Sequence, residues 1–174
     1  MELNYEIFSS KKNRIEFQYP KGWTCEEIPP NDEKSPTFIQ TKSPDSSKGI
    51  LIIYGPHLMS AFGTSLFPGG LYEAFNSSTG YGTNNDAEVI EKPHPVQIDG
   101  QKAAGTFVIR YNNHSPPIIT QTWIVYLGIV TNSQFDIGEY GYKIMYRSED
   151  FYNLENIEIR EQLLKGIKFL CARE

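Results

Sequence analysis

The sequence lacks the features that mark several large classes of protein. It contains only two cysteines, Cys25 and Cys171, which are too far apart in the chain for a structural zinc motif. Its longest apolar runs, residues 49–54 and 123–130, are much shorter than the roughly 20 residues of a membrane-spanning helix. The formal net charge is −5, whereas a nucleic-acid binder that relies on phosphate contacts needs a basic face. We therefore expect no transmembrane segment and no nucleic-acid partner.

A signal peptide is not visible, because residues 1–10 are polar and mixed. Two interpretations of the compartment stay open: a cytoplasmic protein, or an exported protein whose signal has been removed. The same choice governs the cysteines. Cys25 and Cys171 are either two half-buried thiols or, in an oxidising compartment, a disulfide that closes most of the chain.

The residues that are present favour a strand-rich globular domain. The chain has 174 residues, the size of a single domain, 1–174, with a core of its own. Eleven Tyr and ten Phe favour strands over helices. Ile15, Phe17 and Tyr19 alternate with polar residues, as in a strand with one buried face, and Pro20 ends that strand because it has no N–H to donate.

The first half of the chain continues with further strands and one long loop. Residues 23–28 are expected to pair with the opening strand, and residues 37–41 form another strand. The apolar run 49–54 predicts a strand that is covered on both faces. Residues 55–85 show little regular pattern apart from a short helix at 71–75. Loops of that length are usually functional or mobile.

The second half predicts an antiparallel meander. Its strands are expected at residues 87–92, 96–98, 103–111, 119–127 and 141–147. Asp99-Gly100 is a strong hairpin signal between two of these strands. The Pro-His-Pro sequence at residues 93–95 indicates a rigid bend.

The period changes near the C-terminus. Apolar residues from Phe151 to Ile167 recur mostly at three- and four-residue spacings, which predicts an amphipathic helix. Ser148 or Asp150 is expected to cap it, and Gly166 to mark its end. Residues 168–170 then pack back on the sheet.

Four motifs carry a family resemblance: FQYPKGW at residues 17–23, IDGQKAAG at 98–105, YKIMYRS at 142–148 and LLKGIKFL at 163–170. In this order they resemble the Mog1/PsbP-like superfamily. The resemblance implies an α+β fold, an α/β/α sandwich with a central, mainly antiparallel sheet of six or seven strands and a C-terminal helix. The superfamily holds extrinsic subunits of the oxygen-evolving photosystem, a binding partner of a nuclear-transport GTPase, and many uncharacterised prokaryotic proteins. The chain looks most like the last group, and no functional residue is carried over.

Catalytic motifs are missing from the sequence. It has no Gly-x-Ser-x-Gly elbow and no helical His-x-x-x-His pair, so we expect no enzyme activity and no cofactor. His57, His94 and His114 all occur in loop-like contexts. They are either exposed loop residues or, if two or three converge with a carboxylate such as Asp86 or Asp99, ligands of a divalent metal.

The strongest binding candidates lie in the loop at residues 55–85. They are His57, Phe62, Phe67, Tyr72 and Tyr81. Such side chains either fold onto the sheet or stay exposed as a partner surface. The leading hypothesis is a non-enzymatic binding or accessory protein that contacts a protein or cell-surface partner through this loop or through the open face of the sheet. The alternative is a small-molecule or divalent-metal binder, and a hydrolase with an irregular site is a third hypothesis.

Overall fold

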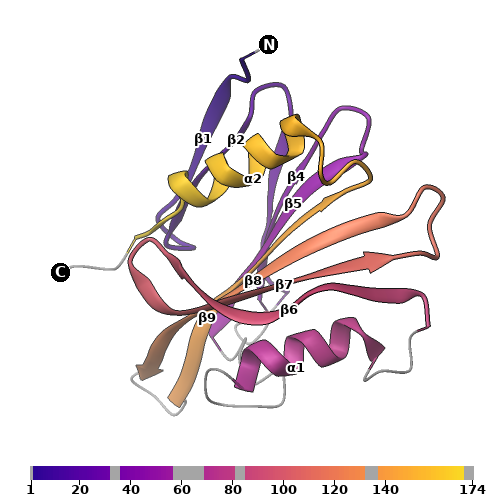
Figure 1. Cartoon of the computed structure of the whole chain (residues 1–174). Helices are drawn as coiled ribbons and strands as arrows, with labels where there is room; N and C mark the ends of the chain where they lie inside the picture. Colours follow the sequence, from indigo (N-terminus) through magenta and orange to yellow (C-terminus); the bar gives the residue numbers. More distant parts are fainter. Residues whose placement is uncertain (1, 32–35, 57–68, 81–84, 132–136, 171–174) are drawn as a thin grey trace.

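The computed structural model describes residues 2–31, 36–56, 69–80, 85–131 and 137–170. The described residues form two sheets and two helices, α1 (Gly69–Ser78) and α2 (Leu154–Gly166) (Figure 1). The smaller sheet contains β1 (Tyr5–Ser10), β2 (Ile15–Pro20) and β10 (Lys168–Phe169), in the order β1-β2-β10. The larger sheet contains β3 (Thr24–Ile28), β4 (Thr37–Lys42), β5 (Lys48–Pro56), β6 (Ala87–Ile98), β7 (Gln101–Tyr111), β8 (Ile118–Thr131) and β9 (Ile137–Ser148).

The seven strands of the larger sheet follow the order β3-β4-β5-β9-β8-β7-β6, and every pair in it is antiparallel. The meander of β6, β7, β8 and β9 is therefore confirmed. The Asp99-Gly100 hairpin is confirmed as well: both residues have positive φ, 48° and 72°, as a type I′ turn requires.

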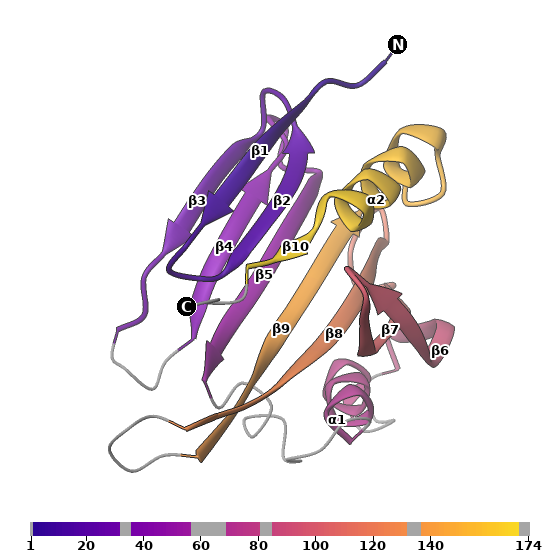
Figure 2. The same ribbon diagram turned by 90° about the vertical axis from the view of Figure 1, so that its left-hand side faces the viewer.

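The two faces of the larger sheet are covered differently, and α1 and α2 lie on opposite sides of it (Figures 1 and 2). The first face, here called the core face, lies under the smaller sheet and α2. Its core includes Ile15 and Phe17 of β2, and Ile159 and Leu163 of α2, all at most 1% exposed. This arrangement confirms an α+β fold with helices on both faces of a mainly antiparallel sheet.

The second face, here called the open face, is covered by α1 over β6 and β7. Leu71 and Ala74 of α1 pack against Phe107 and Ile109 of β7. Gly105 permits this close approach, because a Cβ added there would lie 2.4 Å from Leu71 Cδ2. The helix predicted at residues 71–75 is thus confirmed, and it is longer than predicted.

Strand β9 places alternate side chains on the core face and on the open face. Tyr142, Ile144 and Tyr146 point to the core face and are fully buried. Lys143 and Met145 point to the open face and are half-buried, and Arg147 on the same face is exposed. A period of two in side-chain direction produces this separation.

Two predicted details of the N-terminal half are wrong. Residues 23–28 do not pair with the opening strand, since β3 pairs with β4 in the other sheet. Instead, β2 pairs with β1 along its whole length and with β10 at Ile15 and Glu16. The run at residues 49–54 is fully covered on one face only: Ile50 and Ile52 are buried, whereas Leu51 on the open face is half-buried.

The predicted bend at residues 93–95 is also wrong. Those residues belong to one continuous strand, β6, whose pairing with β7 shifts register three times. Prolines are tolerated there because β6 is the edge of the sheet, where one side of the backbone needs no partner.

The predicted N-terminal cap of α2, at Ser148 or Asp150, is wrong. Asn153 caps α2, and its side chain accepts a hydrogen bond of 2.8 Å from the Asn156 N–H. Gly166 does end the helix, as predicted. None of the described helices is long and apolar enough to cross a bilayer.

Candidate functional site

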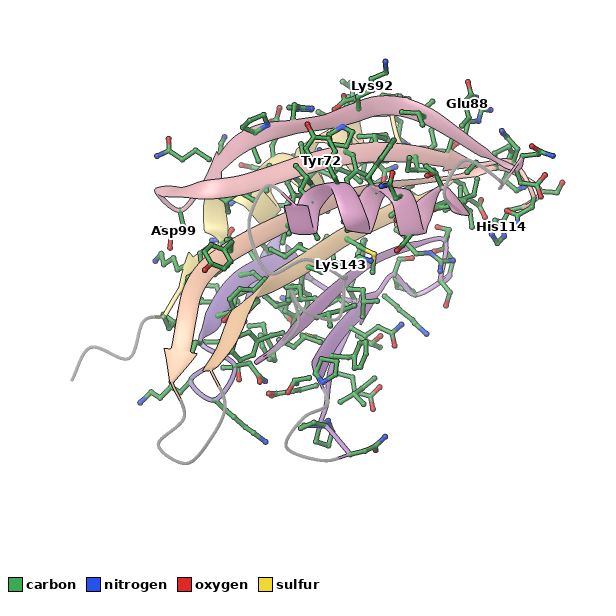
Figure 3. All side chains as sticks on the ribbon, turned by 90° about the horizontal axis from the view of Figure 1, so that it is seen from below. Tyr72, Glu88, Lys92, Asp99, His114 and Lys143 are labelled. Carbon is green, nitrogen blue, oxygen red and sulfur yellow. The ribbon has the colours of Figure 1, made fainter. Side chains whose placement is uncertain are left out.

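Only one residue of the binding site predicted in the loop at residues 55–85 lies within the described residues. His57, Phe62, Phe67 and Tyr81 lie outside the described residues. Tyr72 lies on α1 and is 52% exposed (Figure 3). Its neighbour Phe75 folds onto the sheet, where its ring meets Phe107 edge-on with centroids 5.4 Å apart. Tyr72 therefore remains a surface candidate, on a helix rather than in a loop.

The two described histidines of the predicted metal site, His94 and His114, are not brought together. His94 is not in a loop: it lies exposed on β6, opposite Thr106 of β7. His114 is exposed in the turn beyond Tyr111, the end of β7, which itself lies five residues past Thr106 (Figure 3). Five strand residues span about 17 Å, so these two side chains cannot share one ion. Within the described residues, no group of three His, Cys, Asp or Glu side chains could hold a metal.

Asp99, a carboxylate considered for that metal, has a structural partner. Its Oδ2 accepts a hydrogen bond of 2.9 Å from the Phe169 N–H. This bond ties the β6–β7 hairpin to β10 and so joins the two sheets. Cys25 of β3 is half-buried, and burial, followed by the charge of Glu27, raises the pKa of its thiol to about 11. Cys171 lies outside the described residues, so the disulfide prediction stays open.

The open face carries a hollow of about 380 Å³ beside the part that α1 covers. We call it the basic groove. Its long side chains come from three adjacent strands: Gln40 and Lys42 of β4, Leu51 of β5, and Met145 and Arg147 of β9. Thr120 of β8 and Tyr111 of β7 close its other side, and Ser46 lies in the β4–β5 turn.

Strand register explains why a hollow forms here. Gly49 pairs with Lys42 on one side and with Arg147 on the other, so these three residues form one row across the sheet. Gly49 has no side chain to fill the middle of the row. A Cβ added there would lie 3.8 Å from Arg147 Cγ and 3.1 Å from the Thr41 carbonyl oxygen. The glycine thus forms the floor between two cationic side chains.

The charges around the basic groove are mostly of one sign. Its described lining contains Lys42, Lys48 and Arg147 but no acidic residue. Lys48 is compensated, because its Nζ lies 2.9 Å from Oε1 of Glu155 on α2. Lys42 and Arg147 are exposed and make no ion pair or side-chain hydrogen bond with any residue that the structure describes.

Three other charged groups lie near the basic groove. Glu26 of β3 is exposed and pairs with the lining residue Gln40. Asp45 in the β4–β5 turn accepts hydrogen bonds from Ser43 and Ser47, which lower the pKa of its carboxyl to about 2. Lys143 lies on the same face, four residues before Arg147 on β9 (Figure 3). Burial lowers the pKa of the Lys143 ammonium. The exposed cations that line the basic groove are Lys42 and Arg147.

Comparison with known proteins identifies the scaffold. No protein-family model and no curated protein sequence matches the chain. The solution structure of cyanobacterial PsbP (CyanoP) from Synechocystis sp. PCC 6803 does match, over 97% of this chain and 94% of that one, with a TM-score of 0.54. The chain has a PsbP-like fold. Its sequence is only 14% identical to that of the cyanobacterial protein, so the similarity concerns the fold alone.

Sequence reasoning missed the basic groove on this PsbP-like scaffold. The available signal was the strand YKIMYRS, in which Tyr142, Ile144 and Tyr146 alternate with Lys143, Met145 and Arg147. Two cations on one face of a central strand indicate that this face is not fully covered. The position of Arg147 across Gly49 from Lys42 depends on pairing between strands that are distant in the sequence, which no local pattern reveals.

Proposed function

We propose that the chain is a non-enzymatic binding protein that uses its PsbP-like scaffold to contact a protein partner through the open face of the sheet. The observation that carries this proposal is the basic groove, with two exposed cations that no described residue of the chain neutralises. A rigid sheet that presents a hollow lined by a few polar groups is the usual form of a recognition site.

The surroundings of the basic groove support binding rather than catalysis. Its described lining offers no histidine, cysteine or carboxylate that could act as a general base or nucleophile. Tyr72 lies on the same face of the sheet as the basic groove and is 52% exposed, which extends the surface that a partner could contact.

Affinity capture with charge variants tests the proposal. The wild-type chain, Arg147→Gln and Lys165→Gln would each be immobilised and exposed to a lysate of the source organism. Lys165 is exposed on α2, on the opposite side of the sheet, so its variant loses the same charge away from the basic groove. We expect a partner retained by the wild type and by Lys165→Gln but lost with Arg147→Gln. Equal retention by all three, or by none, contradicts the proposal.

A further inference from the structure

We infer that the basic groove takes an acidic peptide segment of its partner, with a Glu or Asp carboxylate held between Lys42 and Arg147 and a neighbouring apolar side chain on Leu51 and Met145. This inference rests on the proposed function and adds the chemistry of the bound segment. Four features of the described residues lead to it: charge, spacing, an apolar strip and exposure.

The charge of the site is opposite to that of the whole chain. The sequence has 21 acidic and 16 basic side chains, yet the described lining of the basic groove contains cations and no carboxylate. A guanidinium presents a planar fork of N–H donors that matches a carboxylate. Within the part of the chain that the structure describes, no residue engages the donors of Arg147, so they are open to an anion from outside.

The spacing of the cations suits one carboxylate. Lys42 and Arg147 lie on strands that flank β5, so their Cα atoms are about 10 Å apart at the usual strand separation. Both side chains are long, and the bare Gly49 between them leaves the space above the sheet open. A carboxylate above Gly49 would be within reach of both charged ends.

An apolar strip continues from that point along the sheet. Leu51 and Met145 pair with each other directly, one row away from Gly49 and Arg147, and both are half-buried. Tyr111 borders the strip, with its hydroxyl donating to the Ser78 carbonyl oxygen at the end of α1. The two rows lie two strand residues apart, so an extended peptide with a carboxylate at one position and an apolar side chain two residues further on would present both groups to the sheet.

The exposure of the site favours a peptide over a small free anion. Small-molecule sites usually bury most of the ligand surface. Here Lys42, Ser46 and Arg147 are themselves exposed, and the hollow lies on an open sheet surface. Such a site would hold one anchoring side chain of a longer segment whose remaining residues lie along the sheet.

The inference is tested by titrating the 15N-labelled chain with synthetic peptides. The probe is a peptide in which Glu and Leu alternate at every second position with Ser between them, flanked by Gly-Ser, so that both side-chain types face the same way; its control has Gln in place of every Glu. We expect the acidic peptide to shift the backbone amide signals of Gly49, Thr120 and Met145. Because Arg147 is exposed and an exposed ion pair contributes little, Arg147→Gln should weaken binding about two- to fivefold. Lys42→Gln should also weaken it, whereas Lys165→Gln should leave it unchanged.

Each other outcome overturns the inference. Equal binding of the Gln peptide would show that the carboxylates are not recognised. Equal weakening by Lys165→Gln would show a general charge effect. Binding of free succinate as tightly as the peptide would assign the basic groove to small dicarboxylates. Shifts that depend on protein concentration without peptide would assign it to a second copy of the chain. If affinity capture finds an Arg147-dependent partner while the acidic peptide does not bind, the proposed function stands and this inference fails.

Discussion

The core face and the open face of the same seven-stranded sheet differ in how fully their side chains are buried. On the core face, Tyr142, Ile144 and Tyr146 of β9 are fully buried under the smaller sheet and α2. On the open face, the alternating residues Lys143 and Met145 are half-buried and Arg147 is exposed. The comparison indicates that stability is concentrated on the core face and that recognition is available on the open face.

Truncation of neighbouring residues on β9 gives the largest expected effect. Ile144→Ala should lower the free energy of unfolding by about 2–5 kcal/mol, because it leaves a cavity in the core. Met145→Ala, one residue further on the open face, should cost at most about half as much, because less apolar area leaves water there. Urea unfolding of the two variants measures both. Equal losses would contradict the assignment of stability to the core face.

Thiol reactivity probes the edge of the core face. Cys25 packs against the main core, and burial raises the pKa of its thiol to about 11. An ordinary cysteine has a pKa of about 8.5, so at pH 8 alkylation of Cys25 should be about a hundredfold slower than that of a model cysteine peptide. The rate should keep rising up to about pH 11, the pKa of the Cys25 thiol. The measurement uses Cys171→Ser to leave one thiol, and a rate equal to that of the peptide would show that β3 does not bury Cys25.

The covered part of the open face is tested at Gly105. Gly105→Ala should cost about 1–3 kcal/mol of stability, because the new Cβ collides with Leu71 of α1. Leu71→Ala should remove this collision while creating a defect of its own. Thermal or urea unfolding of the double variant should therefore show a smaller loss than the sum of the two single losses. Additive losses would mean that α1 does not rest on Gly105.

A smaller effect is expected at the start of α2. Asn153→Ala removes the cap that satisfies the Asn156 N–H, and should cost about 1 kcal/mol. Asn113→Ala, in the exposed turn between β7 and β8, is the matched control and should change stability by less than about 0.5 kcal/mol. Equal effects of the two variants on urea unfolding would show that the cap does not stabilise the helix over the core face.

The outcome of the sequence predictions follows the same division between local and distant information. Alternation within β9 and the Asp99-Gly100 turn are local features, and both were predictable from side-chain period and backbone conformation. The partners of β2 were not predictable, because β1 precedes it while β10 comes from the far end of the chain. The basic groove was missed for the same reason. Its row of Lys42, Gly49 and Arg147 needs two pairings, one of which joins segments about a hundred residues apart.

The smallest expected change in stability is at Arg147, and this variant tests the difference between the two faces most directly. Arg147→Gln removes an exposed charge that stabilises no described contact, so unfolding should shift by less than about 0.5 kcal/mol. Lys48→Gln breaks the partly exposed pair with Glu155 that links β5 to α2, and should cost about 0.2–1 kcal/mol. If Arg147→Gln destabilised the chain more than Lys48→Gln, Arg147 would be a structural residue. A variant that loses binding at unchanged stability would instead separate recognition on the open face from folding on the core face.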